Sequence, residues 1–322
     1  MRKLKKLLAA VLAGTMVITS LTGCGGSGSS SKGPLTIEQI KKNGKLIVAT
    51  EAAYEPFEYL DKDGETIIGY NADLFKEICN GLGVELDYMD VPFQGILAGL
   101  EAKKYDVVGA TLGITKERAD KYTMTLPIQK GTNVFIKRKG DNSIKTPEDM
   151  EGKVVGTQTS CYNETDTKAF NKKLISKGGK GYKALKTYDG FPDAYMELKN
   201  GKLDIVAQNY ASSAALVKNN PDDYELVQDG KGNVAMVSDT DTWLSWAVRK
   251  SDTELSDYIN SEIKKFKKDG TLDKLQKKWF GQTVELPDKD YIPEKYLPTF
   301  NSNVLDLNMF RIPGLSEQYI NF

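Results

Sequence analysis

The chain has 322 residues, with 44 basic and 44 acidic side chains and no histidine, so its formal charge is zero. This balance argues against a nucleic-acid-binding protein, which needs a basic surface to meet phosphates. The missing histidine excludes Ser-His-Asp and Cys-His hydrolases, zincins and histidine-ligated haem proteins, because imidazole is their general base or ligand.

Residues 1–23 have the pattern of a secretory signal. Four basic residues precede an uncharged apolar run over 7–21, which is shorter than the ~20 residues that span a bilayer as a helix. The run ends at Leu21-Thr22-Gly23-Cys24, which resembles the bacterial lipoprotein signal. That resemblance implies that Cys24 becomes the lipidated first residue of the mature chain. The alternative is an ordinary secretory signal with an incidental cysteine.

A Gly/Ser-rich run follows Cys24, and we expect residues 24–43 to act as a flexible tether. The mature protein would then lie outside the cytoplasm, anchored to the cell membrane through the lipid on Cys24 without spanning it. Removal of residues 1–23 leaves 40 basic and 44 acidic residues, a formal charge of −4.

The next segment alternates strand and helix signals. Strands are predicted over 46–49, 84–88 and 107–110, and helices around Leu74, Ile78 and Leu82, with Asn71 as a possible cap, and around 96–100. This β-α-β-α-β order predicts an α/β sheet with helices on its faces.

A second unit of similar order follows. Strands are predicted over 134–136, 154–156 and 204–207, and helices from Thr146 and over 194–198. Another strand is predicted over 243–248, and two amphipathic helices from Ser251 and from Leu272. No glycine-rich phosphate loop and no cluster of cysteines or acids has the required spacing, so we expect no cofactor and no metal.

Several blocks in order then resemble one family, the polar-amino-acid-binding lipoproteins and periplasmic proteins of ABC importers, such as the lysine/arginine/ornithine- and histidine-binding proteins. The resemblance covers about residues 35–281. Its blocks are Glu51–Phe57, Gly69–Leu74 (with Asn71 where an acid is usual), Phe93–Asp106, Ala110–Arg118, Gly152–Gly156 and Asp269–Gly281.

The family fold implies a two-lobed α/β periplasmic-binding-protein fold of type II with two crossover hinge strands. Lobe 1 would comprise residues 44–130 and 241–281, and lobe 2 with the hinges residues 131–240. Residues 282–322 would be a C-terminal extension, which either packs its aromatic residues on a lobe or docks a partner.

The resemblance also implies how a ligand carboxylate is held. Arg118 carries a planar fork that can bond a carboxylate bidentately. Backbone N–H groups of the strand that contains Ala110, Thr111 and Gly113 would add donors, although the family usually has Ser or Thr at Gly113. The alternative for Arg118 is a solvated charge on a helix.

Three further residues of the first lobe match family positions. Tyr54 and Phe93 match aromatic residues that sandwich the ligand side chain, where stacking suits aliphatic stems, guanidinium groups or rings. Either ring could instead belong to the core. Glu51 matches an acid of the cationic-amino-acid binders, although it could be an exposed acid at a strand end.

The second lobe departs from the family pattern. Cys161, Tyr162 and Asn163 stand where a Gly/Ser/Thr-rich turn is common, and Tyr162 would narrow the cleft. Asn209 aligns with the aspartate expected to hold the ligand's α-amino group. An amide supplies no compensating charge, so either Glu51 compensates or the ligand is a modified amino acid.

The family implies a binding protein that captures a polar amino acid and delivers it to a permease and its ATPase. We expect a monomer that is not an enzyme and binds no nucleic acid. Two alternatives are a ligand-sensing receptor lipoprotein and a cyclohexadienyl-dehydratase-like enzyme on the same fold.

Two expectations concern titratable groups. Because the lobes open and close, Cys79 and Cys161 should be free thiols. Because the chain has no histidine, ligand capture should change little between about pH 6 and 8.

Overall fold

The computed structural model describes residues 33–238 and 242–287, which belong to one compact unit. The expected signal sequence, Cys24 and most of the C-terminal extension lie outside these residues. Within the described ranges, no helix combines the length and apolar character needed to cross a membrane.

The first sheet has the strand order β5-β1-β6-β14-β7, and β8 also pairs with β14. β1 pairs in parallel with β5 and β6, whereas β14 runs antiparallel between β6 and β7. A strand from late in the chain therefore completes a sheet begun near residue 45. The strands are β1 (Lys45–Thr50), β5 (Glu85–Asp90), β6 (Val107–Gly113), β7 (Tyr122–Met124), β8 (Gln129–Gly131) and β14 (Thr242–Arg249).

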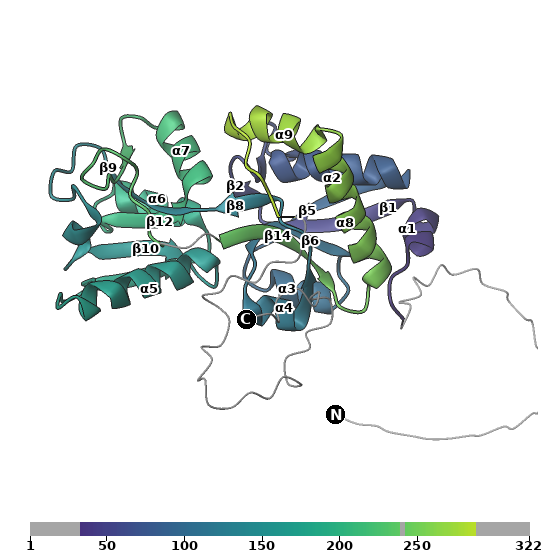
Figure 1. Cartoon of the computed structure of the whole chain (residues 1–322), viewed down its shortest axis with the longest axis horizontal. Coiled ribbons are helices and arrows are strands. Elements are labelled where there is room, and N and C mark those ends of the chain that lie inside the picture. Colours follow the sequence, from purple (N-terminus) through teal and green to yellow (C-terminus); the bar gives the residue numbers. More distant parts are fainter. Residues whose placement is uncertain (1–32, 239–241, 288–322) are drawn as a thin grey trace, which may run out of the picture. The chain divides into compact units, whose positions relative to one another are not determined.

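Helices cover both faces of this sheet (Figure 1). On one face lie α2 (Tyr70–Leu82), α8 (Thr253–Lys268) and α9 (Thr271–Phe280), and on the other lie α3 (Ile96–Glu101) and α4 (Lys116–Lys121). The short α1 (Ile37–Asn43) precedes β1, and a small sheet contains β2 (Ala53–Tyr54), β3 (Glu58–Leu60) and β4 (Ile67–Ile68). We call this part of the molecule the first lobe.

The second lobe is built on a sheet of order β11-β10-β12-β9-β13. Its strands are β9 (Asn133–Arg138), β10 (Val154–Gln158), β11 (Ala184–Tyr188), β12 (Ile205–Asn209) and β13 (Tyr224–Leu226). α5 (Tyr162–Ser176) covers one face, and α6 (Phe191–Lys199) and α7 (Tyr210–Asn219) cover the other (Figure 1). A 3-10 helix, η1 (Pro147–Met150), precedes β10.

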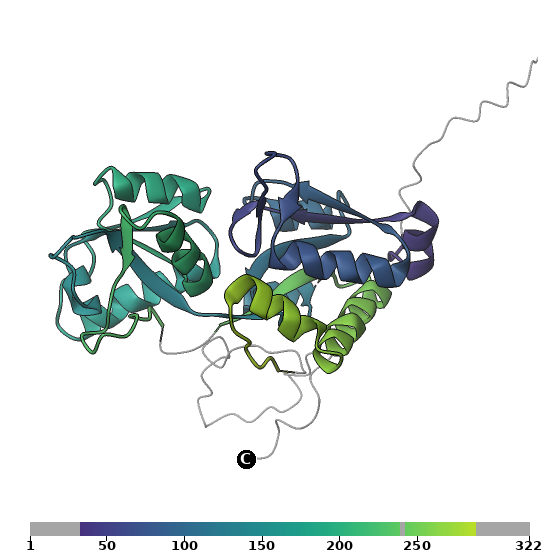
Figure 2. The same ribbon diagram turned by 90° about the horizontal axis from the view of Figure 1, so that it is seen from above.

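The chain passes between the lobes twice. It leaves the first sheet after β8 and enters the second at β9, and it returns between Val237 and Thr242 through a segment that is partly outside the described residues. In Figure 2 the purple and blue early elements lie beside the yellow-green late helices, while the teal elements form the other lobe. The predicted two-lobed α/β fold is confirmed.

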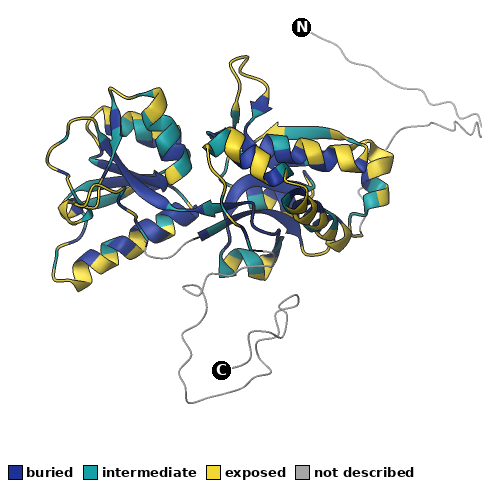
Figure 3. Ribbon diagram, turned by 45° about the horizontal axis from the view of Figure 1, so that its top comes forward, coloured by how far each residue is buried: buried dark blue, intermediate teal, exposed yellow. Residues whose placement is uncertain are grey.

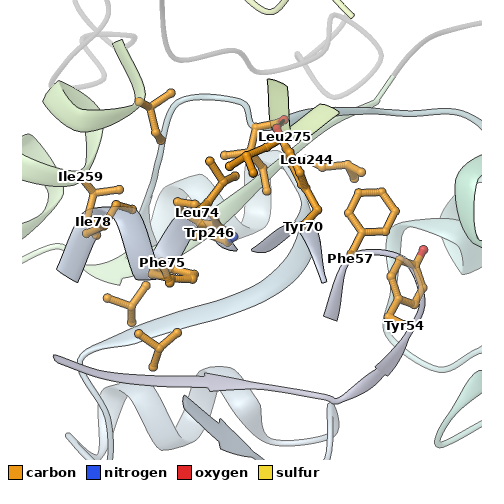
Figure 4. Close-up of a cluster of buried hydrophobic side chains, with 14 of the residues drawn as sticks. Tyr54, Phe57, Tyr70, Leu74, Phe75, Ile78, Leu244, Trp246, Ile259 and Leu275 are labelled. Carbon is orange, nitrogen blue, oxygen red and sulfur yellow. Dashed lines mark hydrogen bonds between the residues drawn. The ribbon is translucent and has the colours of Figure 1, made fainter. Parts of the chain in front are cut away.

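Burial follows the predicted periodicity. The interiors of both lobes are buried and the outer helix faces exposed (Figure 3). In the first lobe, Leu74 and Ile78 of α2 and Ile259 of α8 pack around Trp246, whose ring lies 4.2 Å from that of Phe75 (Figure 4). The sheet thus packs against the apolar face of the helices that cover it.

Some local predictions were wrong. Asn71 does not cap α2; its amide donates to Glu58, because Gly69 occupies the N-cap position. α8 begins at Thr253 after Asp252, two residues later than predicted. Tyr162 and Asn163 belong to a helix, α5, instead of a turn, and Cys161 is its N-cap.

Candidate ligand-binding site

Residues of both lobes line one pocket. The lining residues are Glu51, Tyr54, Glu58, Phe93, Ala110, Thr111, Arg118, Gln158, Cys161, Tyr162 and Asn163. All the predicted ligand-binding residues are in this set except Gly113 and Asn209. Glu58 and Gln158 were not predicted.

The fold explains why these residues meet. Glu51 directly follows β1, Ala110 and Thr111 lie in the second half of β6, and Gln158 is the last residue of β10. The carboxyl ends of parallel strands form the usual ligand-binding edge of an α/β sheet. Each lobe therefore turns this edge toward the pocket.

Arg118 links the two lobes at one end of the pocket. It lies on α4, and Nη1 donates to the carbonyl oxygen of Gly113 at 2.8 Å, while Nη2 donates to that of Ser160 at 3.1 Å. Ser160 adopts a left-handed backbone conformation (φ 61°) just before α5 begins. The guanidinium thus lies near the N-terminus of α5, and both features favour an anionic group.

Glu58 engages the backbone donor that we expected to face a ligand. The backbone N–H of Thr111 donates to Oε1 of Glu58 at 2.8 Å, and the Thr111 hydroxyl donates to Oε2 at 2.9 Å. Asn71 donates to Oε2 at 2.7 Å. Burial raises the pKa of Glu58 well above its usual range, and these three donors oppose the rise. The sequence carried no local signal for this network, because its members come from three separate elements.

Glu51 is the second carboxylate of the pocket. Its Oε2 accepts a 2.7 Å hydrogen bond from Nε2 of Gln158 in the other lobe. Burial raises the pKa of Glu51 to about 7, against the lowering effect of the Gln158 hydrogen bond. A group that titrates near neutrality therefore lines the pocket, contrary to the expectation drawn from the missing histidine.

Tyr162 packs against Gly113 and fills much of the pocket. A Cβ added at Gly113 would lie 2.7 Å from Cβ of Tyr162, closer than real side chains approach. The free volume of the pocket is about 10 Å³, close to the room that one water molecule needs. An amino acid therefore enters only if the lobes part or Tyr162 moves.

Asn209 lies behind Tyr162, outside the pocket lining. Its Nδ2 donates to the Tyr162 hydroxyl at 2.9 Å, and its Oδ1 accepts from the backbone N–H of Ala211 at 2.8 Å, where it caps α7. Both ends of the amide are engaged. Its assignment to the ligand's amino group stays a prediction.

Further hydrogen bonds join the lobes around the pocket. Nε2 of Gln94 donates to the carbonyl oxygen of Thr159 at 2.8 Å, and Asn219 donates to Glu55 at 3.1 Å. Cys79 and Cys161 are both buried free thiols, as predicted. Among the described residues, no group of three or more cysteine, aspartate or glutamate side chains could hold a metal ion.

Comparison with known proteins shows which family the chain matches. Residues 46–282 match the model of the bacterial extracellular solute-binding proteins, family 3. The chain is 32% identical over 289 residues to the L-cystine-binding protein TcyA of Bacillus subtilis, a match that covers 87% of this chain and 99% of TcyA.

Two solved structures share the fold. One is the amino acid ABC transporter substrate-binding protein AbpA of Streptococcus pneumoniae bound to L-arginine (TM-score 0.66, 28% identity, 77% of this chain and 99% of that one). The other is the ancestral amino acid-binding protein AncCDT-1, a precursor of cyclohexadienyl dehydratase (TM-score 0.65, 29% identity, 76% and 99%). The chain belongs to the bacterial extracellular solute-binding proteins of family 3.

Proposed function

We propose that this protein captures a free amino acid in the pocket between its lobes. The observation that carries the proposal is that Arg118 and Glu51 line the same pocket. A zwitterion presents a carboxylate and an ammonium group, and a guanidinium and a carboxylate complement them. The rings of Tyr54 and Phe93 offer apolar surface to the rest of the ligand. The family and the names of the relatives, which bind cystine or arginine, support this proposal.

The wider setting is part of the same proposal. The protein works outside the cytoplasm as a monomer, held at the membrane by a lipid on Cys24, and delivers its ligand to an ABC permease and its ATPase. Residues 44–130 with 241–281 and residues 131–240 act as the closing lobes.

We infer binding without catalysis. All three relatives described above are named as binding proteins, although AncCDT-1 is also named as the precursor of an enzyme, cyclohexadienyl dehydratase. Ligand recovered unchanged after incubation with the protein is the expected result.

A thermal-shift screen tests the proposal. The purified protein is heated with each of the twenty amino acids, cystine and ornithine, and a bound ligand raises the melting temperature by mass action. Calorimetry of each hit then compares the wild type with Arg118→Ala. Loss of the guanidinium that pairs with the ligand carboxylate should weaken binding at least about thirtyfold.

Lys121→Ala is the matched control, because Lys121 lies on the same helix but is exposed and paired with Glu117. It should leave affinity within about twofold. If no amino acid raises the melting temperature, or if Arg118→Ala binds as tightly as Lys121→Ala, the proposal fails.

A further inference from the structure

One polar atom of the pocket has no partner. The Tyr54 side chain is 7% exposed, and its hydroxyl meets no donor or acceptor in hydrogen-bond geometry among the described residues. Burial raises the pKa of Tyr54 well above its usual range, so the hydroxyl keeps its proton. A buried hydroxyl left unpaired costs stability, so such an atom at a binding site calls for an explanation.

The Tyr54 ring is held in place by other aromatic rings. Its centroid lies 5.6 Å from that of Phe57 and 5.8 Å from that of Phe191 in the second lobe. Figure 4 shows Tyr54 beside Phe57 at the edge of the core cluster. Tyr54 lines the pocket together with Tyr162, Cys161 and Glu58. Its ring is therefore a packed part of the pocket wall.

The neighbouring groups fix the direction of the hydrogen bonds. Oδ1 of Asn209 accepts from the backbone N–H of Ala211, which leaves Nδ2 as the donor toward the Tyr162 oxygen. The Tyr162 proton must then point onward. If it meets the Tyr54 oxygen, the proton of Tyr54 is left over; if it does not, both phenols have a proton to donate. In either case this side of the pocket offers an O–H donor.

A cationic group does not suit this donor, because ammonium and guanidinium groups carry only donors of their own. The aspartate expected at residue 209 would have accepted from the α-ammonium group, which every candidate ligand carries and which Glu51 complements here, whereas Asn209 directs its Nδ2 toward Tyr162. We propose that the Tyr54 hydroxyl donates a hydrogen bond to the ligand, and that it selects amino acids carrying an uncharged acceptor, such as an amide or urea carbonyl, in addition to the α-carboxylate. This inference rests on the proposed amino-acid binding.

L-citrulline and L-arginine are a matched pair of probes, because they differ mainly in a carbonyl oxygen against a charged nitrogen. L-glutamine and L-lysine form a second pair. Calorimetry on the purified protein compares the wild type with Tyr54→Phe, which keeps the ring and removes the hydroxyl. Affinity for citrulline or glutamine should fall about tenfold, and affinity for arginine and lysine should stay within about twofold.

The melting temperature separates a ligand contact from a structural role. Without ligand, Tyr54→Phe should melt at about the wild-type temperature, because the hydroxyl has no hydrogen bond to lose other than the one with Tyr162 considered above. Tyr195→Phe is the control, since the Tyr195 hydroxyl donates to Gln208. That variant should lower the melting temperature and leave the ratio of citrulline to arginine affinity unchanged.

The outcomes are distinct. If the wild type binds amino acids but Tyr54→Phe weakens both members of each pair equally, or weakens neither, the inference is overturned and the proposed function stands. If the wild type binds only cationic amino acids, the inference is likewise overturned and the proposed function stands. If the wild type binds no amino acid, the proposed function falls, and this inference with it.

Discussion

At the scale of single residues, Glu51 should make ligand capture depend on pH. Its pKa of about 7 arises from burial, so about one tenth of it is ionised at pH 6 and about nine tenths at pH 8. A ligand ammonium group beside Glu51 needs the ionised form. We predict that calorimetric affinity for the ammonium-bearing ligand rises about tenfold from pH 6 to pH 8. Glu51→Gln should abolish this slope, and an equal slope in both proteins would contradict the assignment.

The stability of the unliganded protein should change in the opposite direction. The pKa of Glu51 is raised from an ordinary 4.5 to about 7 in the folded protein. Between these values the folded protein binds more protons than the unfolded chain, so the contribution of Glu51 is greatest at low pH and is lost as pH rises through about 7. Relative to Glu51→Gln, the wild type should therefore melt at a higher temperature at pH 5 than at pH 8.

Gly113 and Tyr162 should be energetically coupled. A Cβ at residue 113 would lie 2.7 Å from the Tyr162 Cβ, so Gly113→Ala should lower the free energy of unfolding by about 1–3 kcal/mol. In a Tyr162→Gly background this Cβ is gone and the loss should largely disappear. Urea unfolding of the two single variants and the double variant measures the coupling. Purely additive losses would show that the two residues do not touch.

The sequence predicted the charged residues of the pocket better than their partners. Arg118 and Glu51 stand in recognisable blocks, whereas Glu58 and Gln158 gained their roles from hydrogen bonds to Thr111 and Glu51, distant in the chain. The direction of the hydrogen bonds in the pocket was also hard to predict. Asparagine is a favoured N-cap residue, but nothing in the sequence indicates that Asn209 also presents its amide nitrogen to Tyr162.

At the scale of elements, Asp252 fastens the junction between β14 and α8. Its side chain is fully buried, Oδ2 accepts from Nε of Arg249 at 2.6 Å, and Oδ1 accepts from the backbone N–H of Leu35 at 3.0 Å. Asp252→Ala leaves the buried Arg249 with only the more distant carboxylate of Asp106, at 3.9 Å, and should lower the free energy of unfolding by about 3–5 kcal/mol.

Asp257→Ala is the control for this variant, because Asp257 lies on the same helix and is exposed. We expect it to change stability by less than about 0.5 kcal/mol. Urea unfolding measures the stability of both variants. Equal midpoints would show that Asp252 stabilises the protein no more than the exposed Asp257 does.

Helices with an apolar stripe could be predicted, and helices without one could not. α2 and α8 bury residues at helical spacing, and both were found in the sequence. α5 buries Asn163, Asp166 and Thr167 besides Phe170 and Leu174, so its buried face is partly polar and gives no clear periodic signal. The sequence therefore predicts a turn where α5 begins, beside the pocket.

At the scale of the whole molecule, hydrogen bonds hold the two lobes together. The lobes are joined by hydrogen bonds from Asn219 to Glu55, from Gln94 to the Thr159 carbonyl, from Arg118 to the Ser160 carbonyl and from Gln158 to Glu51. We predict that small-angle X-ray scattering finds no decrease in radius of gyration when ligand is added. In the double variant Gln94→Ala/Gln158→Ala, the unliganded protein should be more extended and should contract on ligand addition. Contraction of the wild type by a similar amount would contradict the prediction.

The position of Cys161 has a consequence for measuring this motion. Cys161 lines the pocket and is buried, and burial raises the pKa of its thiol to about 11. Cys79 is buried within the first lobe, on α2, and does not depend on the other lobe. A thiol reagent should therefore modify Cys161 at a rate set by how often the lobes part, and Cys79 only on unfolding. The rate of Cys161 modification therefore reports how often the lobes open, and the rate of Cys79 modification reports unfolding for comparison.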